Sequence, residues 1–287
     1  MKNLKLSLYF RYTLIIFLSI FALAVVLLLA DKITNIRKES KAPLTPVETD
    51  TLSQDDMVKN TPITSLPNLV GGQNRIPILM YHYIRDLNDP SDKIGTNLSV
   101  SPANFAKELG ILQAHDYTTV TFEEIAQNPA LTVKNPIILS FDDGYEDFYT
   151  AAYPELKKHQ MKAVSYVITG KVGGEYMTAA QIKEISDYGI EIGSHTISHP
   201  DLRTLNGQKL KSELTESKAT LEAITGKTVI SFCYPSGKYN DMVVAAVKNA
   251  GYLDATTTNP GLSNFDNLFE LSRYRMNPTT ELSGILK

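Results

Sequence analysis

Apolar residues in this chain form one long uninterrupted block near the start and a series of short runs further on. Residues 12–30 contain no charged side chain, and as a helix rising about 1.5 Å per residue they would cross a hydrocarbon core of roughly 30 Å. Lys2, Lys5 and Arg11 precede the block, which favours a cytoplasmic N-terminus. The pattern predicts an uncleaved membrane anchor, and a cleaved signal peptide is the alternative.

The composition changes twice after this block. Residues 31–74 mix charged and small polar residues with four prolines and lack apolar periodicity, which predicts a flexible extracytoplasmic linker. Residues 75–287 are long enough for a single globular domain. We therefore expect a single-pass membrane protein with its domain outside the cytoplasm, or a secreted protein if the N-terminal segment is cleaved.

The domain alternates between short apolar runs and amphipathic stretches. Apolar runs typical of buried strands lie at residues 76–81, 136–141, 163–168, 190–193, 230–234, 255–258 and 271–276. Predicted helices lie between several of them: one opens at Ser101-Pro102, one runs from the Thr178 capping box to Gly189, and two others cover residues 208–224 and 240–250. This alternation predicts an α/β fold with parallel strands.

Charge and cysteine content exclude several classes of protein. The 28 basic and 31 acidic residues give a formal net charge of −3, which argues against a dedicated nucleic-acid binder. Cys233 is the only cysteine, so the chain can form neither an intrachain disulfide nor a cysteine-rich zinc site.

Polar residues with catalytic potential follow three of the apolar runs. His82 follows the first run, Asp142 and Asp143 follow the second, and His195 and His199 follow the fourth. Sites in parallel α/β folds are built at the carboxyl ends of the strands, so we expect these segments to converge.

The two pairs have the composition of a metal site. If residues 195–199 formed a helical turn, both imidazoles would share a face, a spacing that suits a divalent ion completed by a carboxylate. Asp142 and Asp143 at the end of a buried strand favour a nearby cation, and Gly144 permits a tight turn. Surface histidines and a solvated Asp-Asp-Gly turn are the alternatives.

Residues 140–144 (Ser-Phe-Asp-Asp-Gly) followed by residues 195–199 (His-Thr-Ile-Ser-His) resemble motifs of the polysaccharide deacetylases, carbohydrate esterase family 4. Residues 77–82 and 234–239 support the resemblance, which covers roughly residues 76–276 and is greatest to the branch that acts on extracellular and biofilm polysaccharides. It implies a distorted (β/α) barrel of about seven parallel strands and hydrolysis of N-acetyl groups.

The resemblance also assigns roles. Asp143, His195 and His199 would hold one divalent ion, zinc first and cobalt or nickel as alternatives, and Asp142 would be the general base. The ion would lower the pKa of water and polarise the acetamide carbonyl. A backbone N–H near Ser236 would stabilise the oxyanion.

Two departures from the family pattern shift roles to other residues. Many relatives have an arginine where this chain has Cys233, and Arg273 is our candidate to orient the base in its place, ahead of Arg275 on the same predicted strand face. Many relatives also use a histidine late in the chain as general acid, whereas this chain has none after His199. His82 is therefore the candidate acid, with a neutral residue lining the site as the alternative.

The predicted substrate is an amino-sugar polysaccharide, peptidoglycan or an exported poly-N-acetylglucosamine. Tyr145, Tyr234, Pro235 and Ser236 are expected to contact it or the oxyanion. We expect a monomeric catalytic domain that binds the membrane through residues 12–30 and does not bind nucleic acid. The alternatives are an O-acetyl esterase, a carbohydrate-binding protein that has lost the chemistry and, more remotely, a phosphodiesterase.

Overall fold

The computed structural model describes residues 75–87, 89–128 and 133–286, which lie within one compact unit, Val58–Lys287. The predicted membrane anchor (12–30) and linker (31–74) fall outside the described residues. Within the described ranges, no helix combines the length and apolar character that crossing a membrane requires.

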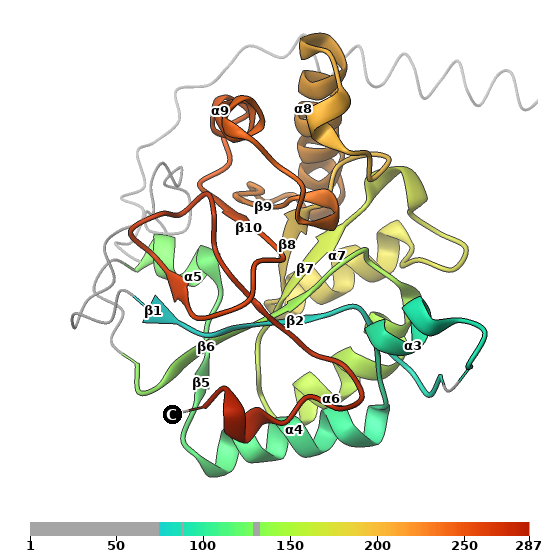
Figure 1. Ribbon diagram of the computed structural model, residues 1–287, viewed down its shortest axis with the longest axis vertical. Helices are drawn as coiled ribbons and strands as arrows, with labels where there is room; N and C mark the ends of the chain where they lie inside the picture. The colour runs from blue at the N-terminus through green and yellow to red at the C-terminus, as the bar shows by residue number, and fades with distance from the viewer. Residues whose placement is uncertain (1–74, 88, 129–132, 287) are drawn as a thin grey trace, which may run out of the picture. The chain divides into compact units, whose positions relative to one another are not determined.

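A curled parallel sheet forms the centre of the domain (Figure 1). Its strands follow the order β10-β9-β8-β7-β6-β2-β12, and β5 also pairs with β6. All of these pairings are parallel, as the alternation of strand and helix predicts. The strands are β2 (Ile78–Tyr81), β5 (Thr118–Thr119), β6 (Pro136–Phe141), β7 (Val164–Val167), β8 (Glu191–Ser194), β9 (Ser231–Cys233), β10 (Asp254–Thr256) and β12 (Tyr274–Arg275).

The segment before β12 brings the two ends of this sheet toward each other. Leu271 forms a parallel bridge with Thr256, next to β10, and its backbone N–H donates to the carbonyl of Ala255. A few residues later β12 pairs with β2 at the opposite end of the sheet. The result is a curled half-barrel, consistent with the expected distorted barrel.

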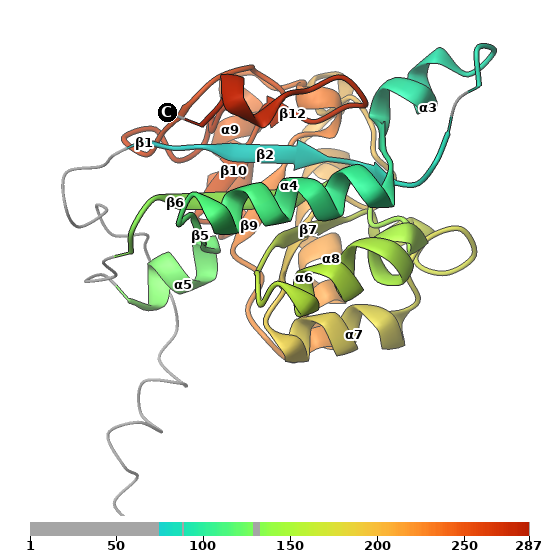
Figure 2. The ribbon, with the colours of Figure 1, turned by 90° about the horizontal axis from the view of Figure 1, so that it is seen from below.

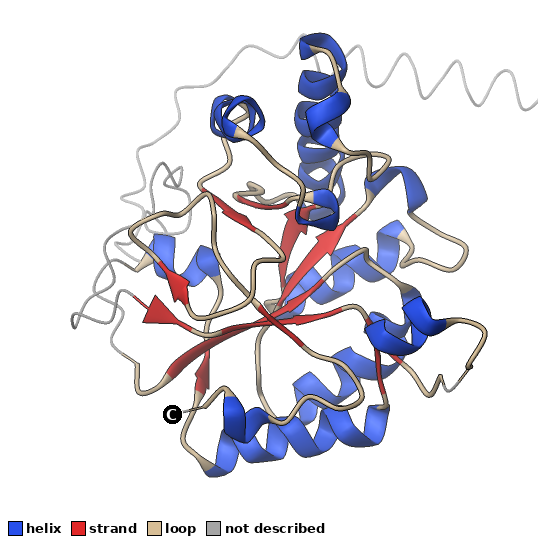
Figure 3. Ribbon diagram, viewed as in Figure 1, coloured by secondary structure: helices blue, strands red, loops and turns tan. Residues whose placement is uncertain are grey.

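Helices surround the strands (Figure 3) and begin and end where the sequence places caps. Ser101 caps α4, and Thr178 forms a capping box with Gln181 at the start of α7, which ends at a left-handed Gly189. Figure 2 shows α4 along one side of β2 and β6. The helices are α3 (Lys93–Leu98), α4 (Pro102–Ala114), α5 (Phe122–Gln127), α6 (Tyr153–Lys158), α7 (Ala179–Tyr188), α8 (Gly207–Thr225) and α9 (Asp241–Asn249).

Several short elements were not predicted. A two-residue strand shows no measurable period, so neither the antiparallel pair β1 (Arg75–Ile76) and β11 (Ser263–Asn264) nor the parallel pair β3 (Tyr83–Ile84) and β4 (Ser99–Val100) has a sequence signal. The π-helix Phe148–Ala152 leads directly into α6.

The sheet separates two apolar clusters, because alternate residues of each strand face opposite ways. Leu139 and Phe141 of β6 pack in the cluster on the helix side, whereas Ile138 packs in the cluster within the curl. Both faces are buried, which explains why the strands appear in the sequence as continuous apolar runs. The same alternation places Ser140 inside the curl, and Asp142 continues that face beyond the strand.

Candidate active site

The ends of β6 and β8 bring Asp143, His195 and His199 together. His195 Nε2 lies 3.6 Å from Asp143 Oδ1, and His199 Nε2 lies 3.8 Å from the same oxygen. One ligand atom from each of the three side chains lies within 4.8 Å of the other two, a spacing at which they could hold a metal ion. These are the imidazole and carboxylate donors that zinc binds in catalytic sites.

The hydrogen bond of His195 directs its other ring nitrogen toward this centre. Its Nδ1 lies 2.8 Å from the carbonyl oxygen of Cys233, an acceptor that requires the proton to be on Nδ1 and leaves Nε2 free to ligate. Burial lowers the pKa of His195, but Cys233, Asp142 and Asp143 outweigh burial and raise it to about 10. The carboxylates that raise this pKa would also attract a metal cation, which would displace the proton from Nε2.

His199 completes the set as a neutral ligand. Burial and the neighbouring His195 lower its pKa, which favours the uncharged imidazole that metals bind. The donor set therefore fits a divalent cation.

The two histidines lie on a loop, so the expectation that they share a helical turn was wrong. Thr196 and His199 have φ values of 70° and 58°, in the left-handed region that a right-handed helix excludes. The rings still converge because the loop reverses direction between them, with the His199 N–H donating to Thr196 Oγ1.

A second group, Asp142, His195 and Cys233, also has the spacing of metal ligands, but its carboxylate is already paired. Arg273 Nη1 donates to Asp142 Oδ1 at 2.6 Å and Arg273 Nη2 to Oδ2 at 2.8 Å. Burial raises the pKa of Asp142, but the charge and hydrogen bonds of Arg273 outweigh burial and hold it well below its usual range. Asp142 is therefore a buried, oriented carboxylate beside the metal centre.

Arg273 lies next to Cys233 and pairs with Asp142. It is fully buried, its Nε donates to the carbonyl of Thr257, and its Nη2 lies 3.2 Å from Cys233 Sγ. The prediction that Arg273 and Arg275 share a face was wrong, because Arg275 is exposed. Arg273 precedes β12 at the point where the chain crosses between the two ends of the sheet, so simple strand alternation does not apply.

His82 also lies beside Asp142. Its Nε2 is 3.8 Å from Asp142 Oδ2, and its buried Nδ1 has no hydrogen-bond partner among the described residues. Burial lowers the pKa of His82, and Arg273 and Arg275 lower it further, against the opposing effects of Asp142 and Asp143.

Aromatic rings line one side of the site. Tyr145 stacks between Tyr83 and Tyr176, with centroid distances of 3.8 and 4.8 Å, so both of its faces are covered. The sequence reasoning missed Tyr83, whose only signal is its position next to His82. The guanidinium of Arg85 covers the Tyr83 ring at 3.4 Å from its centroid.

The loop after β9 lies next to the site, since the carbonyl of Cys233 at the end of β9 accepts from His195. Tyr234 and Pro235 are buried, and the Tyr234 hydroxyl donates to the carbonyl of Phe269. Ser236 is exposed and has a φ of 54°. The buried pair can shape the wall of the site, while Ser236 is accessible.

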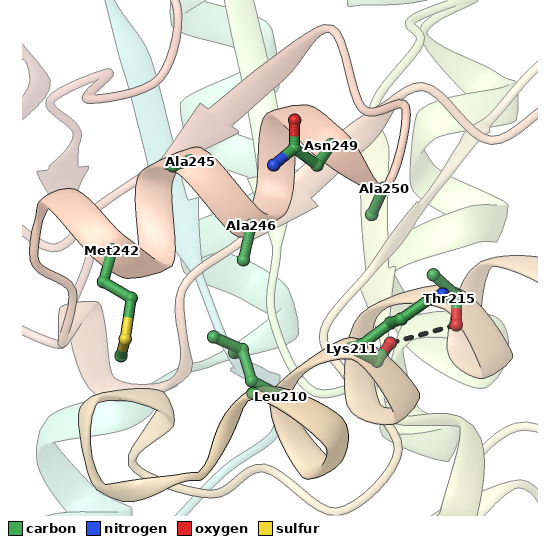
Figure 4. A pocket seen from close by; sticks show the side chains of 9 residues that line it. Leu210, Lys211, Thr215, Met242, Ala245, Ala246, Asn249 and Ala250 are labelled. Atoms are coloured by element: carbon green, nitrogen blue, oxygen red, sulfur yellow. Dashed lines mark hydrogen bonds between the residues drawn. The ribbon is translucent and has the colours of Figure 1, made fainter.

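The structure also contains an apolar groove that carries none of this chemistry (Figure 4). It has a volume of about 520 Å³ and lies between α8 and α9, with Leu210, Met242 and Ala246 among its lining residues. None of the residues that line it is a predicted site residue.

Comparison with known proteins identifies the family. The family model for polysaccharide deacetylase matches residues 131–254. A Bacillus subtilis (strain 168) protein, YxkH, named as a polysaccharide deacetylase, is 35% identical over 210 residues, which cover 71% of this chain and 72% of that protein. The poly-beta-1,6-N-acetyl-D-glucosamine N-deacetylase of Staphylococcus aureus (strain MRSA252) is 29% identical over 204 residues, 62% of this chain and 70% of that protein.

Solved structures agree with this assignment. The Streptococcus pyogenes deacetylase PplD, in complex with acetate, superposes with a TM-score of 0.69 at 33% identity and covers 74% of this chain and 98% of its own. A Bacillus cereus polysaccharide deacetylase superposes with a TM-score of 0.65 at 35% identity, covering 73% and 67%. This chain therefore belongs to the polysaccharide deacetylase family, hydrolases that act on N-acetyl amide bonds.

Proposed function

We propose that this protein is a metal-dependent deacetylase that removes N-acetyl groups from an N-acetylglucosamine-containing polysaccharide at the cell envelope. The observation that carries the proposal is the convergence of Asp143, His195 and His199 beside a carboxylate, Asp142, that a buried arginine orients. The three metal ligands have free ligand atoms, whereas Asp142 is already hydrogen-bonded to Arg273. The two groups of residues therefore have different roles.

In this proposal Asp143 Oδ1 and the Nε2 atoms of His195 and His199 hold one divalent ion, zinc in the first instance, with cobalt or nickel as alternatives. When bound, the ion supplies Lewis acidity to the acetamide carbonyl and lowers the pKa of a water molecule. The hydrogen bond from His195 Nδ1 to Cys233 keeps that ring oriented.

Asp142 is the general base. Arg273 holds both carboxylate oxygens in place, so Asp142 stays ionised and can accept the proton of the attacking water. The new carbon–oxygen bond forms at the acetamide carbon, the carbon–nitrogen bond breaks, and acetate leaves a free amine on the sugar. The proton passes from Asp142 to neutral His82, whose Nε2 lies 3.8 Å from Asp142 Oδ2, and His82 then donates it to the leaving nitrogen.

The substrate would lie between the two walls of the site. The backbone around Ser236 would stabilise the oxyanion, with Pro235 and the buried Tyr234 fixing that loop. Because neighbouring rings cover both faces of Tyr145, a sugar would contact its edge or hydroxyl rather than stack on its face.

The polysaccharide is either an exported poly-N-acetylglucosamine or peptidoglycan. The name of the Staphylococcus aureus relative supports the first, and a catalytic domain tethered beside the cell wall would suit the second equally. We propose that residues 12–30 anchor the protein in the cell membrane, that residues 31–74 are a linker, and that a monomeric catalytic domain lies outside the cytoplasm.

The test measures metal content and acetate release together. Purified protein is assayed on poly-N-acetylglucosamine and on peptidoglycan, alongside Asp143→Ala and Asp142→Asn. We expect Asp143→Ala to lose both metal and activity, and Asp142→Asn to keep the metal and lose activity. Asp187→Asn, an exposed change on α7, is the matched control and should be active. A wild-type protein that binds no divalent ion, or releases no acetate from either polymer, would refute the proposal.

A further inference from the structure

The loop that carries the two histidines has an unfavourable backbone conformation. Thr196 and His199 both have positive φ values, and neither is glycine. Each such residue costs of order 1 kcal/mol and persists only where the surroundings fix it. The position of the His199 ring therefore depends on whatever holds residues 195–199.

The hydrogen bonds of this loop show which groups hold it. Three of its five backbone N–H groups have local or strand partners: His195 donates to the carbonyl of Val167, Thr196 to Ser194 Oγ and His199 to Thr196 Oγ1. The remaining two, those of Ile197 and Ser198, lie at the turn between the histidines and have no backbone acceptor within the described part of the chain.

Both of these N–H groups donate to one carboxylate from another element. Glu213, on α8, accepts from Ile197 N at 2.8 Å and from Ser198 N at 3.0 Å, both through Oε2. Its Oε1 accepts from the Ser198 hydroxyl at 2.6 Å. Hydrogen bonds to an ionised acceptor are shorter and stronger than neutral ones, and here one half-buried side chain makes three.

The carbonyls of the same turn are held from the opposite side. Thr169 N donates to the carbonyl of Thr196 at 3.0 Å, and Gly170 N donates to that of Ile197 at 2.9 Å. Residue 170 is glycine for a steric reason, since a Cβ there would lie 2.6 Å from the Ile197 oxygen. The turn is thus fixed between the backbone after β7 and the Glu213 carboxylate.

The geometry points to Glu213 as a positioning residue of the metal site: by binding the N–H groups between His195 and His199, it fixes the distance between their ring nitrogens. This inference rests on the proposed function, because it assumes that the two histidines ligate a metal. Without Glu213, two N–H groups would lose their acceptor, and the turn between the two histidines would lose one of its two external supports.

The experiment measures metal affinity in the full-length chain. The protein is stripped of metal and titrated with Zn²⁺ against a competing chelator, and with Co²⁺ by visible absorption. We expect Glu213→Ala to weaken binding of both ions by about 10- to 100-fold, the usual loss when a group that orients metal ligands is removed. We expect Glu213→Gln to recover most of the affinity, because its amide oxygen can still accept both N–H groups.

Two further variants make the result specific. Glu216→Ala is the matched control. Glu216 is an exposed residue of the same helix that accepts from Ser212, so the metal affinity of this variant should be unchanged. Glu213→Asp keeps the charge but is one methylene shorter, so we expect it to bind metal as weakly as Glu213→Ala. If the alanine variant does not fold, the metal affinity of Glu213→Asp still tests the inference.

The outcomes separate this inference from the proposed function. A purely structural role would lower the unfolding temperature of the metal-free Glu213 variants and leave their metal affinity equal to that of wild type, which would overturn the inference. A wild-type protein that binds neither ion would instead overturn the proposed function, and the inference with it. Weakened binding in the alanine and aspartate variants, with recovery in Glu213→Gln, would support it.

Discussion

Replacing Asp254 with asparagine should make the folded protein more stable than wild type, and by a larger margin at pH 8 than at pH 5. Asp254 and Glu191 are fully or almost fully buried at the first residues of β10 and β8, and Ser231 lies between them. Ser231 Oγ is within hydrogen-bond distance of Glu191 Oε1 and 2.8 Å from Asp254 Oδ2. A hydroxyl has only one proton, so it can satisfy only one carboxylate.

The second contact is satisfied only if one of the two acids is protonated. Glu191 also accepts the backbone N–H of Glu123, whereas Asp254 Oδ1 has no hydrogen-bond partner among the described residues. The proton therefore belongs on Asp254, which can then donate to Ser231. Burial and the neighbouring Glu191 raise the pKa of Asp254 well above 3.8. An asparagine amide would donate to Ser231 in the same way at every pH.

The magnitude follows from the shift in pKa. Glu191 is present in both proteins, so the difference between variant and wild type comes from Asp254, whose pKa burial and Glu191 raise. A carboxyl whose pKa is raised on folding stabilises the fold at low pH, and this stabilisation is lost as pH rises through the folded value. Each pH unit between the unfolded and the folded pKa costs about 1.4 kcal/mol of unfolding free energy, so the loss between pH 5 and pH 8 is at most about 4 kcal/mol.

Urea denaturation at pH 5 and pH 8 provides the assay. The excess in unfolding free energy of Asp254→Asn over wild type should grow by up to about 4 kcal/mol between pH 5 and pH 8. Asp187→Asn, an exposed control, should show no such pH dependence. A difference between Asp254→Asn and wild type that is the same at both pH values would refute the shared-proton reasoning.

Three further predictions follow from contacts within the curl and at the site. Gly193→Ala should destabilise the protein by about 1–3 kcal/mol in urea denaturation, because the new Cβ would lie 2.4 Å from the Tyr166 ring. Gly110→Ala is the control: a Cβ at this helical position would have no atom within 4 Å, so the change should not be destabilising. Arg273→Met should leave Asp142 as an unpaired buried charge and lower the unfolding free energy by about 3–5 kcal/mol. Equal stability of variant and wild type would contradict this prediction. Chelation should abolish acetate release and added Zn²⁺ should restore it; activity that survives complete metal removal would contradict the proposed chemistry.

The main elements of the fold could be predicted because their signals are local. Buried parallel strands appear as continuous apolar runs, and Thr178 with Gln181 forms the capping box that its spacing predicts. The two-residue strands could not be predicted, since they depend on pairing with distant residues. The path of the chain around Arg273 was also not predictable from alternation, because the chain changes strand partners there.

The site was predictable in part for a different reason. Asp142, Asp143, His195 and His199 have distinctive chemistry and follow strands whose ends meet, so their positions could be inferred from order alone. The conformation of the histidine loop could not, because it is set by contacts with Glu213 and Gly170. In the sequence, Glu213 is one of several charged residues on an amphipathic helix and carries no distinguishing signal.

Pairing between β2 and β12 also constrains when the enzyme can become active during synthesis. All other strands of the main sheet leave the ribosome before β12, so a nascent chain can assemble the metal ligands before Arg273 has been made. Until then Asp142 has no guanidinium to balance its charge, and burying it is unfavourable. We expect translation products that stop short of residue 273 to remain open and sensitive to proteases, so that assembly of the ligands alone does not yield a working catalyst.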